Sequence, residues 1–518
     1  MKKNIYKILG LILILSVNTS CINDLDTEPE VDLTLEQILA NDPNAVEGLV
    51  SRIYSTFALS SVKGAGQSDI SGADPGESPF IRGLVNLQDF TADGMKNRWG
   101  DNGLDQLTTT SGWSPNNKFF KYVYDRVYYI VPQSTNIILT LDRVNVSNKE
   151  QTQSELRFLR SLAYYYLIDL FGKGPLVTND TYNSTLPLKE ATRTELFNYV
   201  EAELLDIETK LPQTNTYGRA TQAAAQMLLS KLYMNAQVYT GTQRYNDATT
   251  YLNKVIASSF SLESNYKLNF SANNNTSKEI IFPLIADALT SQSFGNTTYI
   301  VNGSLSTETM TLTDFGASEG WAGHRATKAW YGLFGSSVGS LNSSTDIRAK
   351  LFWTGGHNWE MDDYKNWADG LPSIKFTNKN ADGSGTATQF SSTDFPLFRL
   401  SDAYLMYAEC ALRGANGASM AQALTYVNDV RTRSGAGAIS SSALNLDFIL
   451  DERGRELNLE GMRRQDLIRF GKFTGSSYLW PWKGGVKNGV SIPSTYNLFP
   501  IPTSALQANL NLTQNPGY

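Results

Sequence analysis

The segment ELRFLRSLAYYYLIDLF, residues 155–171, decides the fold class. Its apolar side chains recur at steps of three and four residues, which places them on one face of an α-helix. That face consists of Leu156, Leu159, Ala163, Tyr166 and Leu170. A glycine at 172 and a proline at 175 follow and end the helix. The segment therefore predicts a long helix that buries one continuous stripe.

Similar helical patterns follow this segment along the chain. They cover residues 192–211, 221–239, 245–257, 401–413, 419–434 and 446–469. Short turns rich in Gly, Pro and Thr join them, which is typical of stacked helical hairpins such as tetratricopeptide repeats. We therefore expect an all-α dominated fold built from tetratricopeptide-like helical hairpins.

The helical signal fades over residues 260–395, where Ser, Asn, Thr, Gly and aromatic residues dominate. A disordered linker would leave these aromatic side chains exposed to water, which is unfavourable. The stretch is therefore not a disordered linker. We expect a loop-rich lobe with short strands, beside a helical scaffold over residues 35–259 and 396–491. An irregular tail, residues 492–518, completes the chain.

The composition excludes several classes of protein. Asp and Glu outnumber Lys and Arg by 50 to 44, giving a formal net charge of −6, whereas phosphate binding needs clustered excess cation. Two histidines and two cysteines in 518 residues leave few ligands for a transition-metal site or a disulfide framework. We expect no nucleic-acid partner, no metal site and no cofactor.

The N-terminal residues carry an export signal. Three lysines precede a short apolar run, Ile8 to Val17, which is too short to span a bilayer, and small polar residues then lead to Cys21. This pattern predicts a lipoprotein signal peptide over residues 1–20, with lipidation of Cys21; an ordinary cleaved signal is the alternative. Acylation would anchor the protein to the membrane surface. Residues 21–34 are acidic and are predicted to form a tether between the anchor and the folded part.

The other cysteine, Cys410, lies in a helical pattern and is expected to be a buried structural thiol.

Residues 449–472 carry a dense group of charges. The group comprises Glu452, Arg453, Arg455, Glu456, Glu460, Arg463, Arg464 and Asp466. Paired carboxylates of this kind can serve as the acid and base of a glycoside hydrolase. On one helix, however, each has an arginine three or four residues away, which favours its ionised form, whereas a general acid needs the opposite. The group therefore predicts structural ion pairs.

Two tryptophans lie in polar, glycine-bracketed loops. Trp99 and Asn102 stand in NRWGDNG, and Trp321 stands in SEGWAGHRATK. A turn holds such a ring near the surface, where exposure has a cost. A sugar ring has an apolar CH face that can lie on an indole, while its hydroxyls need amide, carboxylate or guanidinium partners. These loops are therefore candidate carbohydrate sites; structural packing is the alternative.

Several longer strings resemble the SusD/RagB family from one end of the mature chain to the other. They include RFLRSLAYYYLIDLFGKGPLV from Arg157, LFRLSDAYLMYAECALR from Leu397 and ILDERGRELNLEGMRRQDLIRFGK from Ile449. The resemblance implies a lipid-anchored outer-membrane protein that faces the cell exterior, has tetratricopeptide-like helix pairs, and binds glycans. It also implies a partner, a SusC-like TonB-dependent transporter.

Within the family, the loops look most like those of its starch-binding founding member. That protein uses an arc of two Trp and one Tyr, with Asn, Arg and Asp as hydrogen-bonding partners. The resemblance carries these roles to Trp99, Asn102, Trp321, Tyr299, Arg82 and Asp74. The loop around Tyr299 matches poorly, and the arc tyrosine could be a neighbour. A cluster of three tryptophans within residues 336–369 departs from the pattern and leaves linkage and chain-length preference open.

These observations predict a non-enzymatic protein that captures α-glucan, as maltooligosaccharide or starch, for uptake. A different polysaccharide, such as a β-glucan, is the first alternative. A lipid-anchored glycoside hydrolase is a second, with Asp101 beside Trp99 as its best catalytic candidate. A structural lid without sugar affinity is a third.

Overall fold

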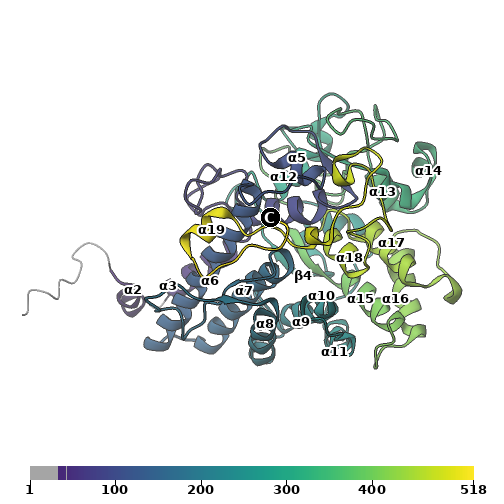
Figure 1. Ribbon diagram of the computed structural model, residues 1–518. Coiled ribbons are helices and arrows are strands. Elements are labelled where there is room, and N and C mark those ends of the chain that lie inside the picture. The colour runs from purple at the N-terminus through teal and green to yellow at the C-terminus, as the bar shows by residue number, and fades with distance from the viewer. Residues whose placement is uncertain (1–32, 43) are drawn as a thin grey trace, which may run out of the picture.

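The computed structural model describes residues 33–42 and 44–518, and helices dominate it (Figure 1). Helices neighbouring in the chain pack against one another, α6 on α7, α7 on α8 and α9 on α11, as in stacked helical hairpins. The scaffold helices are α2 (Leu35–Asn41), α3 (Ala45–Ser55), α6 (Lys118–Arg143), α7 (Lys149–Leu170), α8 (Arg193–Ile207), α9 (Gln222–Met234), α10 (Ala236–Thr240), α11 (Tyr245–Ile256), α15 (Leu400–Leu412), α16 (Met420–Arg433), α17 (Leu446–Glu456) and α18 (Arg463–Arg469). The predicted fold class is confirmed.

Helix α7 contains the segment that decided the fold class, and all five residues of its predicted stripe are buried. Helix α8 begins where predicted, because Thr192 and Glu195 form a capping box.

The long helix α6 was not predicted. Pro132 lies in its middle, and a proline there is a helix-breaking signal. Packing of α6 against α7 overrides that local preference.

The prediction of one continuous helix over residues 446–469 was wrong. α17 ends at Glu456 and α18 begins at Arg463. Between them Leu459 and Gly461 have φ of 59° and 70°, outside the helical region. The Gly461 N–H donates to Oδ2 of Asp89 at 3.1 Å, so the break ties the C-terminal helices to the N-terminal third of the chain.

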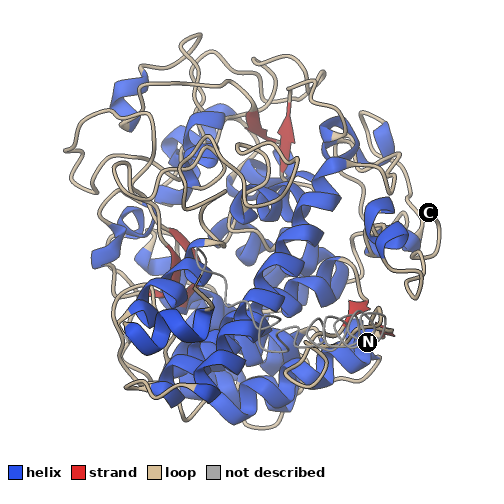
Figure 2. Ribbon diagram, turned by 90° about the vertical axis from the view of Figure 1, so that its left-hand side faces the viewer, coloured by secondary structure: helices blue, strands red, loops and turns tan. Residues whose placement is uncertain are grey.

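The loop-rich lobe forms the upper part of the molecule in Figure 1, and Figure 2 shows its small strand pairs among long loops. Two antiparallel strand pairs belong to it, β1 (Met95–Asn97) with β5 (His324–Ala326) and β4 (Ile280–Leu284) with β6 (Phe395–Arg399). A third antiparallel pair, β2 (Gly174–Pro175) with β3 (Glu190–Ala191), lies in the connection between α7 and α8. The short helices outside the scaffold are α4 (Phe80–Val85), η2 (Asn86–Phe90), α5 (Leu104–Thr108), α12 (Thr297–Gly303), α13 (Lys328–Tyr331), α14 (Val338–Ser343) and α19 (Thr503–Ala508), and the remaining turns are η3 (Tyr266–Phe270), η4 (Asn274–Thr276), η5 (Leu312–Phe315), η6 (Gly332–Phe334), η7 (Ile347–Leu351), η8 (Ser441–Ala443), η9 (Lys483–Gly485) and η10 (Ser494–Asn497). The β1–β5 pair brings a segment near residue 97 into the lobe.

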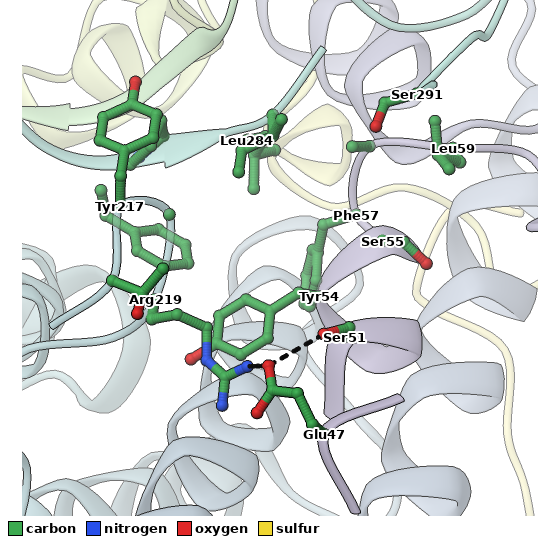
Figure 3. Close-up of a pocket in the computed structure, with 16 residues that line it drawn as sticks. Glu47, Ser51, Tyr54, Ser55, Phe57, Leu59, Tyr217, Arg219, Leu284 and Ser291 are labelled. Carbon is green, nitrogen blue, oxygen red and sulfur yellow. Dashed lines mark hydrogen bonds and ion pairs between the residues drawn. The ribbon is translucent and has the colours of Figure 1, made fainter. Parts of the chain in front are cut away.

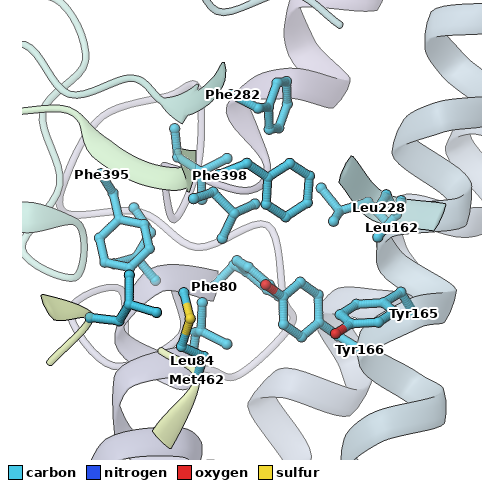
Figure 4. Close-up of a cluster of buried hydrophobic side chains, with 14 of the residues drawn as sticks. Phe80, Leu84, Leu162, Tyr165, Tyr166, Leu228, Phe282, Phe395, Phe398 and Met462 are labelled. Carbon is cyan, nitrogen blue, oxygen red and sulfur yellow. The ribbon is translucent and has the colours of Figure 1, made fainter. Parts of the chain in front are cut away.

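A shared apolar core joins the lobe to the scaffold (Figure 4). Phe282 of β4 and Phe398 of β6 lie beside α7 and α9, and the Phe80 ring of α4 meets Tyr166 edge-on at 5.0 Å between ring centroids. Each buried aromatic ring contributes a large apolar area to this core.

Cys410 is also buried, as predicted, and burial raises the pKa of its thiol to about 12.

The predicted ion pairs of the C-terminal helices are confirmed, but their partners come from distant elements. Glu456 accepts from Arg348 at 2.8 Å, Arg399 at 2.7 Å and Arg433 at 2.5 Å, and its carboxylate has no exposed surface. Burial raises the pKa of Glu456, but the three arginines outweigh burial and hold it far below its usual range. This network joins helices α16 and α17 to the strand β6 and the turn η7.

The same network gives a test by pH. Burial raises the pKa of Glu279, but Arg433 and Arg399 outweigh burial and hold it at about 2. In the unfolded chain a glutamate titrates near ~4.3. The folded state therefore favours the ionised form, and the resulting stability is present above about pH 5 and is lost as the pH falls through about 4.3 towards 2. The free energy of unfolding, measured with urea between pH 6 and pH 3, should decrease as the pH falls. In the Glu279→Gln variant it should decrease less steeply with pH. Equal pH dependence in the two proteins would contradict this prediction.

Candidate functional site

The β1–β5 pair positions the two predicted tryptophan loops. Asn97 stands opposite His324 in the antiparallel register. The chain leaves β1 toward Trp99 and enters β5 from Trp321, so both loops emerge at the same end of the pair. Two loops that are far apart in sequence therefore meet at one place on the lobe.

Trp99 is held in place by both backbone and side chain. The Asn97 side chain accepts a hydrogen bond from the Trp99 N–H at 2.7 Å, and the indole Nε1–H donates to the Trp321 carbonyl at 2.9 Å. The indole also packs against Gly323, where an added Cβ would lie 2.5 Å from the ring. Glycine is therefore required at 323, and the ring keeps a fixed position with part of its surface exposed.

The Trp321 loop is fastened to the end of α12. The Trp321 N–H donates to the Asn302 carbonyl at 2.7 Å, and the Gly323 N–H donates to the Gly303 carbonyl at 2.8 Å. Between them Ala322 has φ of 52°, in the left-handed region, which costs a non-glycine residue about 1–3 kcal/mol. Such strain persists only where the surroundings fix the backbone, so the position of Trp321 is preorganised.

Three partly exposed rings form a curved series. The Trp99 and Trp321 rings have centroids 6.4 Å apart and planes inclined by 56°. Trp321 and Phe294 repeat the spacing at 6.4 Å, with an inclination of 44°, and the buried Phe390 supports Phe294 from 4.9 Å. Because each ring plane is inclined to the previous one, the three rings do not form one flat platform, and we refer to them as the curved series of rings.

Arg82 lies beneath the first tryptophan and is only 7% exposed. Its guanidinium carbon is 4.5 Å from the Tyr299 ring centroid and 5.7 Å from that of Trp99. Nη1 donates to the Gly76 carbonyl at 3.1 Å, and Nη2 lies 3.8 Å from the half-exposed Asp101 carboxylate. Arg82 therefore places a positive charge beside the Trp99 ring.

Tyr299 lies below this surface, not on it. It has no exposed area, its hydroxyl donates to Asn86 at 2.7 Å, and its ring meets that of His324 at 4.5 Å. Burial, with Arg82 nearby, holds the pKa of His324 well below its usual range, so the imidazole is neutral. Tyr299 therefore supports Trp99, and it cannot offer a ring face to a ligand from this position.

The two remaining predicted residues differ in their surroundings. Asp74 is exposed, and its Oδ1 accepts from the backbone N–H groups of Gly76 at 2.8 Å and Glu77 at 3.0 Å. Since Gly76 in turn accepts from Arg82, the Asp74 turn orients that arginine. Asn102 is exposed on the Trp99 loop. The structure therefore brings Trp99, Trp321 and Arg82 into one constellation, with Asp74 and Asn102 at its margin.

Three further residues complete the surface and were missed in the sequence. Phe294 supplies the third ring, Glu319 accepts from the Trp321 indole N–H at 3.2 Å, and Gln389 donates to Glu319 at 2.9 Å. Phe294 stands in the polar string QSFGN, with a glycine directly after it, and this setting was the available signal. Ring faces bordered by guanidinium, carboxylate and amide groups suit a ligand with apolar CH faces and many hydroxyls.

A cavity of about 340 Å³ lies between α3 and β4 (Figure 3). Its walls include Phe57 and Leu284, and Arg219 pairs with Glu47 at 2.5 Å on one side. None of the six predicted glycan-binding residues lines it. The aromatic surface and this cavity are therefore separate features.

The predicted lipidation site, Cys21, lies outside the described residues. Within residues 33–42 and 44–518, no helix combines the length and the apolar character needed to cross a membrane.

Family models and curated relatives that match this chain all have descriptions of one kind. A family model described as "SusD family" matches residues 361–518, and one described as "Starch-binding associating with outer membrane" matches residues 85–234. The starch-binding protein SusD of Bacteroides thetaiotaomicron is 33% identical, over 98% of this chain and 98% of its own. SusD-like protein P25 of Formosa agariphila is 26% identical, over 96% and 97%.

Solved structures share the fold. A SusD superfamily protein from Parabacteroides distasonis superposes with a TM-score of 0.71 at 20% identity, covering 92% of this chain and 99% of that one. Surface glycan-binding protein A from Bacteroides thetaiotaomicron, solved in complex with laminarihexaose, gives 0.69 at 20% identity, covering 91% and 99%.

Proposed function

The chain belongs to the SusD family, and on that premise we propose that it is a cell-surface glycan-binding lipoprotein that captures α-glucan. It delivers starch fragments or maltooligosaccharides to a SusC-like TonB-dependent transporter of the outer membrane. Lipidation of Cys21 anchors it there, facing the cell exterior. The family model described as associating with the outer membrane supports this location.

The curved series of rings is the observation that carries the α-glucan assignment. Successive rings are inclined by 56° and 44°, so they can lie against successive sugars only if the ligand curves as well. An α-1,4-glucan curves in this way, whereas a straight β-1,4 chain would require coplanar rings. A preorganised arc also spares the ordering cost that a flexible loop would incur on binding.

The carboxylates near the rings are arranged for binding rather than for hydrolysis. Asp101 and Glu77 lie 3.8 Å and 3.9 Å from the same Arg82 guanidinium, and Glu77 also pairs with Lys118 at 2.8 Å. Both carboxylates are therefore already paired with cations, as in structural ion pairs. Glu319 is engaged by two hydrogen bonds.

Calorimetry with four ligands tests the proposal. Maltoheptaose and α-cyclodextrin should bind with similar affinity, because the cyclic glucan is already bent, and cellohexaose should bind more weakly. Laminarihexaose serves as the curved β-linked comparison. In the same solutions no reducing sugar should be released above background.

Tighter binding of laminarihexaose would transfer the proposal to a β-glucan. Preference for cellohexaose would contradict the curved-ligand argument. Turnover that Asp101→Asn abolishes would favour the hydrolase alternative, and the absence of binding to any glycan would favour the structural lid.

A further inference from the structure

A second pair of partly exposed rings lies elsewhere on the lobe. The Tyr364 and Trp482 rings meet nearly perpendicularly, at 72°, with centroids 4.9 Å apart. They come from loops that are far apart in sequence. Two residues before Trp482, Trp480 is only 1% exposed and fills the core beneath the loop. The loop therefore uses one tryptophan for packing and presents the other at the surface.

The backbone holds Trp482 in a strained position. Its φ is 69°, in the left-handed region that a bulky residue rarely adopts. The Trp482 N–H donates to the Lys487 carbonyl at 3.2 Å, and its indole N–H donates to the Met361 carbonyl at 3.4 Å. Buried Lys483 donates to two carbonyls of the same loop, at Gly475 and Tyr478, and fixes its shape. Strain of this kind clusters at ligand-binding positions, where the surrounding structure maintains it.

Helix α5 connects this pair to the curved series of rings. The helix begins at Leu104, directly after the Trp99 loop, and its five residues span only about 7–8 Å. Just beyond its other end the Thr109 carbonyl accepts from the Gly485 N–H, in the Trp482 loop, at 2.9 Å. On the helix itself Asp105 pairs with Lys365, the neighbour of Tyr364, at 3.1 Å. One short helix therefore contacts the loops of both ring sites.

Exposed polar groups border the second pair. Lys487 pairs with Asp362 at 2.8 Å, and the side chains of both are at least half exposed. The Lys365–Asp105 pair is similarly open. Exposed ion pairs of this kind contribute little to stability, so their atoms are available to hydrogen-bond hydroxyl groups.

We propose that Tyr364 and Trp482 form a second glycan-binding platform, which engages the same polysaccharide chain as the curved series of rings. This inference rests on the proposed function. A short oligosaccharide occupies only the curved series, whereas a longer chain follows α5 and reaches both. The second contact is then intramolecular, so affinity rises with chain length.

The test compares a short ligand, maltotriose, with a long one, soluble amylose, in calorimetry and in affinity electrophoresis. The Trp482→Gly variant removes the ring and places at φ 69° the residue that adopts this conformation most readily, which protects folding. We expect amylose affinity to fall about 10-fold in Trp482→Gly and in Tyr364→Ala, with maltotriose affinity unchanged. Val486→Ala, at an exposed position of the same loop, is the matched control. It should leave both the amylose affinity and the maltotriose affinity unchanged.

Unchanged amylose affinity in both variants would overturn the second platform while the proposed function stands, provided that Trp99→Ala still weakens both ligands. An equal loss for both ligands, with a lower melting temperature, would show that the pair only fastens two loops, and would also overturn it. Failure of the wild type to bind any glycan would instead refute the proposed function.

Discussion

Replacing Trp99 with alanine is expected to weaken maltoheptaose binding about 5- to 150-fold, or roughly 1–3 kcal/mol. The indole is a fixed, partly exposed ring within the series, so its removal deletes both apolar contact area and the surface that orients the sugar. Trp321→Ala should have an effect of the same size. Asn102→Ala should cost about 1 kcal/mol, since water can partly replace a neutral hydrogen bond at an exposed position. Calorimetry on each purified variant gives these values.

The control for this experiment is Trp353→Ala. Trp353 is also partly exposed in the lobe, but its ring lies against Phe315 and its indole N–H donates to Gly355. Its removal should leave maltoheptaose affinity unchanged. If Trp99→Ala and Trp321→Ala also retain full affinity with unchanged melting curves, this surface is not the glycan site.

The Glu456→Gln substitution is expected to destabilise the protein by about 3–5 kcal/mol. The side chain keeps its size, but the buried Arg348, Arg399 and Arg433 each lose a charged acceptor. Each arginine keeps another carboxylate partner, but the buried network loses one negative charge, and no water is present to compensate for that loss. Urea unfolding at pH 7 measures the loss.

An ion pair whose carboxylate is exposed to solvent provides the contrast. Glu47 also pairs with an arginine, Arg219, but its side chain is 70% exposed. Glu47→Gln should cost less than about 1 kcal/mol, because surface ion pairs are weak. Equal effects of the two substitutions would show that burial does not set the strength of the network.

Much of the scaffold was predictable because its helices carry their own signals. The apolar stripe of α7 and the capping box of α8 are local features, and each element formed where its pattern placed it. The break between α17 and α18 was not predictable. It depends on Glu456 and Gly461 meeting partners from other parts of the chain, and no local preference records those contacts.

The candidate site, like the scaffold, was predictable only in part. Trp99 and Trp321 were recognisable because a ring in a glycine-bracketed polar turn is unusual. The resemblance assigned the third ring to Tyr299, which is buried, whereas the structure presents Phe294 beside Trp321, because exposure of a ring depends on tertiary packing. Side-chain burial in long loops has no periodic signature, which limited the prediction there.

The pairing of β1 with β5 also sets the order in which the molecule can become functional. The hydrogen bond from Trp99 to Trp321 joins residues 222 positions apart. Contacts of such high sequence separation form late in folding, since the intervening chain must first lose most of its conformational freedom. A truncated chain therefore has helices but no ring surface, and ligand affinity would report completed folding rather than secondary structure alone.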